Sequence, residues 1–142
     1  MRVYLDNCVF NRPFDDQNQI RIRIESEAKL YIQDTIKNKN IELVWSYILE
    51  FENSQNPHGE RRVAIYKWKA ISSIFITVNS SILEAANKLV LIGVKPKDAL
   101  HVACAIEGKP NYFITTDDRL NTKLNSVGII QSLNPVDYIK EL

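Results

Sequence analysis

The N-terminus reads Met1-Arg2-Val3-Tyr4-Leu5-Asp6, a short run of β-forming residues that stops on an acid. Arg2–Leu5 is therefore predicted to be a strand with Asp6 at its carboxyl end. The same order recurs near the C-terminus, where the predicted strand 112–115 leads through Thr116 to Asp117. In open parallel sheets, functional groups gather at the carboxyl ends of strands. Asp6 and Asp117 are accordingly candidates for one site, although an acid after a strand is about as often a turn or cap residue.

Strand-like and helix-like segments alternate through the rest of the chain. Apolar residues recur at helical spacing across 20–38, and β-branched residues dominate 74–78, a predicted strand. This alternation predicts an α/β three-layer sandwich around a mostly parallel central sheet, in one domain covering 1–142. Further strands are predicted at 41–45 and 128–131, further helices at 46–53, 60–72, 82–92, 98–107, 117–124 and 135–142, and a polar loop at 7–19.

A third acid lies on the apolar face of a short predicted helix. Ser46 is a favourable N-cap for this helix, which continues through Ile48 and Glu50 to Glu52. With ~100° per residue, Glu52 falls about 40° from Ile48, inside the apolar arc, and Glu50 falls about 200° away, on the solvent side. Glu52 is therefore the candidate site residue, and Glu50 is the alternative if the helix starts with a different rotation.

The fourth acid opens the stretch Asp98-Ala99-Leu100-His101-Val102-Ala103-Cys104-Ala105-Ile106. This helix is apolar nearly all round and is predicted to be buried. Asp98 also fits a simple negative charge at a helix N-terminus. His101 follows one turn later, where it could hydrogen-bond a site acid or a phosphate. A core histidine satisfied by its neighbours fits at least as well, so no catalytic role is assigned to it.

The four acids map to one edge of the predicted sheet. Ionised carboxylates are costly to bury, and like charges brought together disfavour ionisation further. Four of them in one cleft would need a cation, and all-oxygen carboxylate sites suit hard ions such as Mg²⁺ or Mn²⁺. The pattern therefore favours metal-assisted phosphodiester chemistry.

Composition sets limits on the class of protein. The 142 residues include 45% hydrophobic side chains, with 18 basic and 17 acidic residues. The net charge of +1 argues against a strongly basic nucleic-acid-binding protein, yet setting the four acids aside leaves a positive excess that suits a polyanionic substrate. Cys8 and Cys104 are too few for a disulfide framework. No apolar run approaches the ~20 residues of a membrane span, and Asp6 comes too early for a signal peptide. We expect a reduced, cytoplasmic protein.

Over essentially its full length, the chain resembles the PIN-domain ribonucleases, a family that includes the VapC-type toxins of toxin–antitoxin modules. The resemblance lies in Tyr4-Leu5-Asp6-Asn7-Cys8-Val9, in Ser46 to Glu52, in Lys97-Asp98-Ala99-Leu100-His101-Val102-Ala103 and in Thr115-Thr116-Asp117-Asp118-Arg119-Leu120. It implies a PIN-like fold and a Mg²⁺- or Mn²⁺-dependent endoribonuclease. It places the metal-binding and catalytic roles on Asp6, Glu52, Asp98 and Asp117.

The chain departs from the family pattern directly after Asp6. The family often has Ser or Thr followed by Asn at these positions, where this chain has Asn7 and Cys8. The Asn7 amide can still donate and accept hydrogen bonds, whereas Cys8 loses the usual amide contact. Cys8 fits best as a small buried apolar residue.

Supporting roles are expected around the acids. The metal shell, the site acids or the phosphate would be contacted by Asn7, Thr115, Thr116 and Asp118, and the RNA backbone by Arg119, with Lys95, Lys97 and Lys123 near the same edge. RNA is then the substrate. An antitoxin protein and a second copy of the chain are candidate partners, because the helix over 20–36 and the segment after Pro57 carry more apolar residues than a small sheet needs. No membrane partner is expected.

Two other classes of function compete with the nuclease. A non-catalytic PIN-like module that binds RNA or protein is the main alternative, supported by the altered Asn7-Cys8 pair. A phosphoryl-transfer protein with an aspartyl nucleophile also places acids at strand ends, but Cys8 stands where its second acid would be. A nucleotide-binding fold is disfavoured because there is no Gly-rich phosphate loop.

Overall fold

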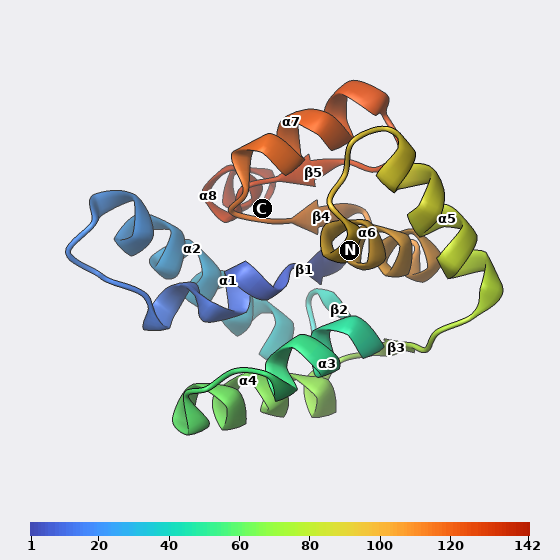
Figure 1. Ribbon diagram of the computed structural model, residues 1–142. Helices are drawn as coiled ribbons and strands as arrows, with labels where there is room; N and C mark the ends of the chain where they lie inside the picture. The colour runs from blue at the N-terminus through green and yellow to red at the C-terminus, as the bar shows by residue number, and fades with distance from the viewer.

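Five parallel strands form the centre of the protein. The computed structural model describes residues 1–142 and contains β1 (Arg2–Leu5), β2 (Glu42–Ser46), β3 (Ile74–Ile76), β4 (Tyr112–Ile114) and β5 (Ser132–Leu133). Their order in the sheet is β3-β2-β1-β4-β5, and every neighbouring pair is parallel (Figure 1). The predicted α/β fold with a parallel central sheet is confirmed.

Helices cover both faces of this sheet. Right-handed crossovers place the helices between β1 and β3 on one face and those between β3 and β5 on the other. The first group is α1 (Asn7–Asn11), the 3₁₀ helix η1 (Arg12–Phe14), α2 (Ile20–Lys37), α3 (Tyr47–Ser54) and α4 (Gly59–Ile71). The second is α5 (Ser80–Leu91), α6 (Pro96–Gly108) and α7 (Asp118–Val127). The chain ends with α8 (Pro135–Tyr138), which contacts α2, and the 3₁₀ helix η2 (Ile139–Glu141).

Two predicted segments are wrong. The polar stretch 7–19 contains α1 and η1, because the Asp6 carboxylate caps α1 at Asn7 N, and Val9 and Phe10 bury themselves in the core. The last strand was expected at 128–131, but α7 continues to Val127 and ends on Gly128 at φ 75°, so the strand begins only at Ser132.

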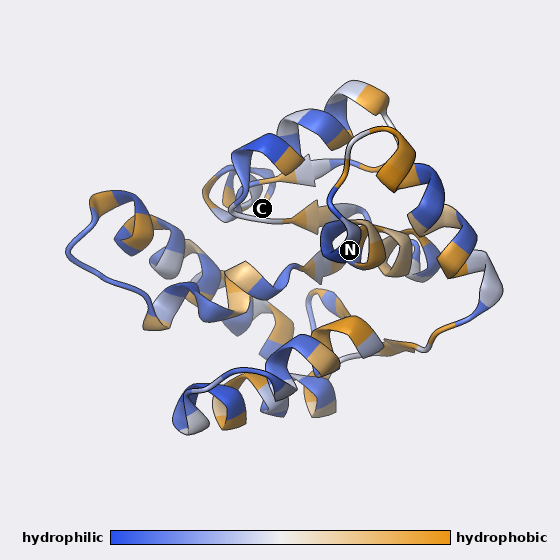
Figure 2. Cartoon of the chain, viewed as in Figure 1, coloured by the Kyte–Doolittle hydropathy of each residue, from blue (hydrophilic) through white to orange (hydrophobic).

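The core lies between the sheet and its helices. Tyr4, Trp45 and Phe113 on three adjacent strands are fully buried, and α6 packs tightly on the sheet. At Gly108 a β-carbon would stand 2.8 Å from Val44 Cγ1, so this close approach requires glycine. Figure 2 shows α6 largely hydrophobic and α7 largely hydrophilic, in keeping with the burial of one and the exposure of the other.

One buried cation is held by aromatic rings rather than by an acid. Lys29 on α2 is only 3% exposed, and its Nζ lies 5.6 Å from the Phe10 ring and 5.4 Å from the Trp68 ring. Burial, reinforced by the charge of Lys37, lowers the pKa of Lys29 to about 7.

None of the helices has both the length and the apolar character needed to span a lipid bilayer.

The topology defines where a site should lie. From β1 the chain moves to β2 on one side, whereas β4 and β5 lie on the other side of β1. The crevice outside the carboxyl ends of β1 and β4 is therefore the switch point of this open sheet, the usual place for a ligand.

Candidate functional site

Asp6 is the first side chain beyond β1 and is buried at the switch point. Its backbone N–H donates to Ile114 O of β4, which ties the two strand ends together. Its Oδ1 accepts from Asn7 N at 2.8 Å, and its Oδ2 accepts from the Thr115 hydroxyl at 2.8 Å. The carboxylate is thus fixed in direction by one backbone donor and one buried hydroxyl.

Asp117 follows β4 and caps the next helix. Its Oδ1 accepts from the backbone N–H groups of Arg119 and Leu120 at 3.0 and 3.1 Å. No hydrogen bond engages its Oδ2. Asp117 is exposed, so its second oxygen is available to a ligand in the crevice.

Glu52 is held by two hydrogen bonds. The Ser46 hydroxyl caps α3 at Leu49 N. The Glu52 Oε1 lies 2.6 Å from His101 Nε2, and its Oε2 accepts from Asn7 Nδ2 at 3.0 Å. Burial by itself would raise the pKa of Glu52, but the hydrogen bond and charge of His101 outweigh it and lower that pKa.

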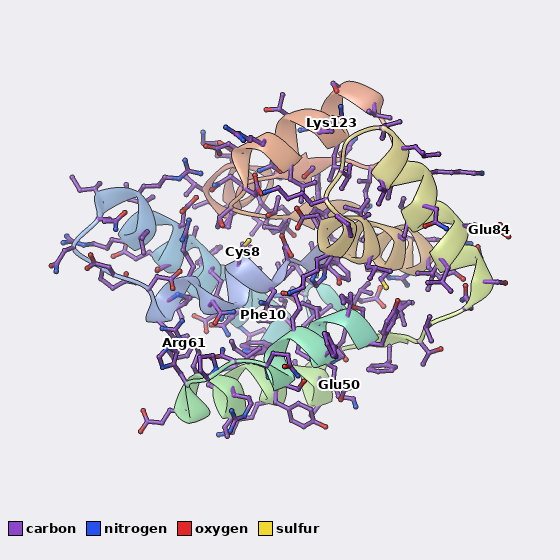
Figure 3. The ribbon with its side chains drawn as sticks, viewed as in Figure 1. Cys8, Phe10, Glu50, Arg61, Glu84 and Lys123 are labelled. Atoms are coloured by element: carbon purple, nitrogen blue, oxygen red, sulfur yellow. The ribbon has the colours of Figure 1, made fainter.

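Glu50 points elsewhere. It pairs with Lys69 of α4 at 2.6 Å and does not line the crevice (Figure 3). The helical-wheel choice of Glu52 over Glu50 therefore agrees with the side-chain placement. Phe51, which lies between them in the sequence, is 53% exposed.

Asp98 differs from the other three acids in that no neighbouring group holds its carboxylate. It lies half-buried in the first turn of α6, and no hydrogen bond engages its carboxylate. Burial and the negative charges of Asp6, Asp117 and Glu52 raise the pKa of Asp98 to about 6, despite the opposing charge of His101. Asp98 is therefore an electrostatic neighbour of the other three acids.

All four acids line one cavity of about 410 Å³. Six other residues complete its wall: Asn7, Cys8, Asn11, Asp15, Lys97 and Thr116. The acids come from four separate segments, so only the fold brings them together. The donor set fits a hard divalent cation, because Asp98 is uncompensated and Asp117 keeps a free oxygen. No three of the His, Cys, Asp and Glu side chains already converge on a common metal position.

A buried hydrogen-bonded chain leads into this cavity. Tyr4 OH lies 2.7 Å from Ser46 Oγ and 2.7 Å from His101 Nδ1, and His101 Nε2 reaches Glu52. Burial would lower the pKa of His101, but the Glu52 hydrogen bond and the nearby carboxylates raise it. The sequence allows His101 to be either the partner of a site acid or a core residue, and in the structure it is both. Tyr4 is a site residue that the sequence pattern does not single out, although its position two residues before Asp6 puts both side chains on one face of the chain.

Cys8 is part of the cavity wall rather than a purely apolar core residue. Its Sγ lies 3.3 Å from Thr115 Oγ1 and 3.5 Å from Asp6 Oδ2, and it accepts from Thr116 N at 3.4 Å. Burial and the charge of Asp6 raise the pKa of Cys8 to about 12, so it is a neutral thiol. Hydrogen bonds of the Cys8 sulfur thus partly replace the amide contact that the sequence was expected to lose at this position.

The remaining expected site residues divide into two groups. Thr115 lies behind Asp6, and Asn7 and Thr116 line the cavity. Asp118 and Arg119 do not line it. Asp118 accepts two hydrogen bonds from Arg21, at 2.6 and 2.8 Å, and these lower its pKa.

No protein-family model matches the chain, and no curated protein matches it in sequence. Solved structures do match in shape. FitAcB from Neisseria gonorrhoeae superposes with a TM-score of 0.63 at 13% identity, covering 94% of this chain and 97% of that one.

Two VapBC structures give the same result. VapBC-1 from nontypeable Haemophilus influenzae has a TM-score of 0.61 at 16% identity, covering 95% of this chain and 98% of that one. VapBC2 from Rickettsia felis, solved bound to a DNA fragment from its promoter, has a TM-score of 0.58 at 12% identity, with 94% and 98% covered. Likeness at this identity concerns the fold. The chain therefore has the PIN-like α/β fold of the VapBC structures, in agreement with the resemblance drawn from its sequence.

Proposed function

We propose that this protein is a divalent-metal-dependent ribonuclease that hydrolyses RNA phosphodiester bonds. The observation that carries the proposal is the meeting of Asp6, Glu52, Asp98 and Asp117 in one cavity at the switch point of the sheet. Mg²⁺ or Mn²⁺ would be held by these carboxylates. When bound, it would supply Lewis acidity toward the phosphate and a lowered pKa for bound water.

The chain's own residues act by positioning and by charge. The Thr115 hydroxyl and Asn7 N–H hold Asp6 in one orientation, and the backbone of α7 does the same for Asp117. His101 and Asn7 hold Glu52 and keep it ionised, so that it is a ligand or a base for the attacking water. Fixing these groups in advance lowers the cost of organising them during the reaction.

A cleavage assay tests this function. Single-stranded RNA is incubated with Mn²⁺ and wild-type protein, and with the Asp6→Asn, Glu52→Gln, Asp98→Asn and Asp117→Asn variants. We expect cleavage by the wild type and a loss of at least a hundredfold in each variant. Glu50→Gln is the matched control, because Glu50 lies two residues from Glu52 but outside the cavity. Undiminished cleavage by the Asp98→Asn protein would refute its role.

One observation favours the alternative of a non-catalytic module. The carboxylates line the cavity without converging on a metal position. A module of this kind would bind RNA or protein but show neither Mn²⁺-dependent cleavage nor carboxylate-dependent binding of Mn²⁺. The two proposals therefore differ in a direct metal titration.

We also propose that the protein acts as the toxin of a toxin–antitoxin pair in the cytoplasm. The fold shared with FitAcB and VapBC supports this. Exposed apolar side chains suit a protein partner, either an antitoxin or a second copy: Ile20, Ile24, Leu30 and Tyr31 on α2, and Val63 and Tyr66 on α4. Co-purification with the product of an adjacent short reading frame, with loss of RNA cleavage in the complex, would support the pairing. Light scattering measures self-association.

A further inference from the structure

Two cavities continue from the carboxylate cavity along α7. The first, of about 260 Å³, shares Asp98 and Asp117 with the carboxylate cavity and is also lined by Lys95, Arg119 and Lys123. The second, of about 350 Å³, shares Arg119 and Lys123 with the first and adds the hydroxyl groups of Thr122 and Ser126. We call Lys95, Arg119, Thr122, Lys123 and Ser126 the α7 track. Overlapping walls make it continuous with the four acids.

The three cations of the α7 track have no acidic partner. Lys95, Arg119 and Lys123 form none of the ion pairs in the protein. The one acid confined to the outer cavity, Asp118, is neutralised by its two hydrogen bonds to Arg21. The track therefore presents uncompensated positive charge beside a strongly negative cavity.

Lys123 spans the gap between α7 and the turn that precedes α6. Gly93 in that turn has φ 98°, and a β-carbon there would stand 3.4 Å from Lys123 Nζ. Figure 3 shows Lys123 on α7 beside this turn. Glycine thus leaves room for the ammonium group, which lines the inner cavity together with Lys95 and Arg119.

The unpaired cation of the carboxylate cavity itself is Lys97, which lies beside Asp98 in the first turn of α6, and the side of the cavity toward η1 has no unpaired cation. That side is lined by Asn7, Asn11 and Asp15, and Asp15 is already paired with Arg12 and Arg61. A polyanion that crosses the four acids is therefore attracted along α7 and not along η1. This difference in charge would direct a bound polyanion along α7 as it leaves the carboxylate cavity.

We propose that the α7 track binds consecutive phosphate groups of a single-stranded RNA as the strand leaves the carboxylate cavity. This assignment rests on the proposed nuclease function for the identity of the polyanion. Neither cavity is lined by an aromatic side chain, so bases have no stacking surface there. The track therefore reads the backbone, and it binds homopolymers of different bases with similar affinity.

Salt-dependent binding tests the track without requiring catalysis. A fluorescein-labelled 12-nucleotide RNA is titrated with protein in EDTA, and anisotropy is followed from low to moderate KCl. Each phosphate contact contributes about 0.7 to the slope of log K against log salt for a single strand. The Lys95→Gln/Arg119→Gln/Lys123→Gln protein should lose about 2 from this slope, and its affinity at low salt should fall at least tenfold.

A matched triple variant shows whether RNA binding depends on the α7 track itself or only on the net positive charge of the protein. Lys39, Lys67 and Lys88 are exposed, unpaired and outside both cavities, and their change to Gln removes the same net charge. This control should keep the wild-type slope, and thermal melting should show both triple variants folded. A wild-type slope in the track variant, or an equal loss in both variants, would overturn the track.

The outcome remains separate from that of the nuclease proposal. If the wild type cleaves RNA with Mn²⁺ but the track variant keeps its slope, the track alone fails. If the track variant loses its slope while the wild type cleaves nothing, the nuclease function fails and the α7 track stands as an RNA-binding site.

Discussion

Replacing Asp98 by asparagine should stabilise the protein in the absence of divalent cations. The side chain is half-buried, has no hydrogen-bond donor, and lies beside three other carboxylates. Burial and these neighbours raise its pKa from 3.8 to about 6. Because asparagine keeps the shape and removes the charge, the substitution should relieve the repulsion without opening a cavity.

The size of the effect follows from the pKa shift. Two pKa units correspond to about 3 kcal/mol when fully expressed, and screening by solvent at a half-exposed group reduces this to about 1.5 kcal/mol. Removing a first-turn carboxylate from α6 costs roughly 0.5 kcal/mol of helix-dipole interaction. The net gain at neutral pH is therefore about 1 kcal/mol, or about 4 °C in Tm for a chain of this size.

The gain should depend on pH in a defined direction. The folded state holds the Asp98 proton up to about pH 6, whereas the unfolded chain releases it near pH 4. Wild-type stability contributed by this group is thus present below about pH 4 and is lost as pH rises toward 6. The advantage of Asp98→Asn should therefore be absent at low pH and complete above about pH 6.5.

Urea unfolding in EDTA at several pH values measures this difference. Glu60→Gln is the matched control, because Glu60 is an acid in the first turn of α4 and lies outside the cavity. It should lose a few tenths of a kcal/mol at neutral pH. An Asp98→Asn protein that is less stable than the wild type at pH 7.5, or equally stabilised at pH 4 and pH 7.5, would refute the electrostatic reasoning.

Three further predictions concern stability. Lys29→Met should raise the free energy of unfolding at pH 6 by about 2 kcal/mol, because it removes the buried charge, although it also removes the contacts of that charge with the aromatic rings. Urea unfolding should show this gain shrinking as pH rises from 7 toward 10. A gain that stays constant with pH would contradict the prediction. Gly108→Ala should destabilise by about 1–3 kcal/mol, because its β-carbon would press on Val44; an unchanged Tm would show that the helix shifts freely. His101→Phe should cost about 2–3 kcal/mol at pH 7, because Glu52 loses its partner beside the cavity; wild-type stability by urea unfolding would rule this out.

Much of the fold could be predicted because its signals are local. The strands β1 and β4 are short β-forming runs that end at acids or threonines, and α2 carries a clear helical period. The capping roles of Ser46 and Asn79 also follow from residue type. Local rules therefore placed the elements, and the parallel sheet followed from their alternation.

The failures occurred where tertiary contacts override local composition. The segment 7–19 is polar overall, yet Asp6 caps a helix there and Phe10 packs against Trp45 with ring centres 5.6 Å apart. The Tyr4–His101–Glu52 chain joins residues from β1, α6 and α3. The sequence allowed a contact between His101 and a site acid, but it did not identify Glu52 and Tyr4 as the two partners. The same applies to the unpaired cations of α7, because the nearby acid Asp118 forms its ion pair with Arg21 of α2 instead of with them.

The central claim is that four carboxylates from separate segments form one divalent-cation site. Calorimetric titration of Mn²⁺ tests it most directly, on the wild type, on Glu50→Gln, and on a protein with Asp6, Glu52, Asp98 and Asp117 changed to their amides. The account predicts saturable binding by the first two and none by the third. Equal binding by all three, or no binding by the wild type, would contradict it.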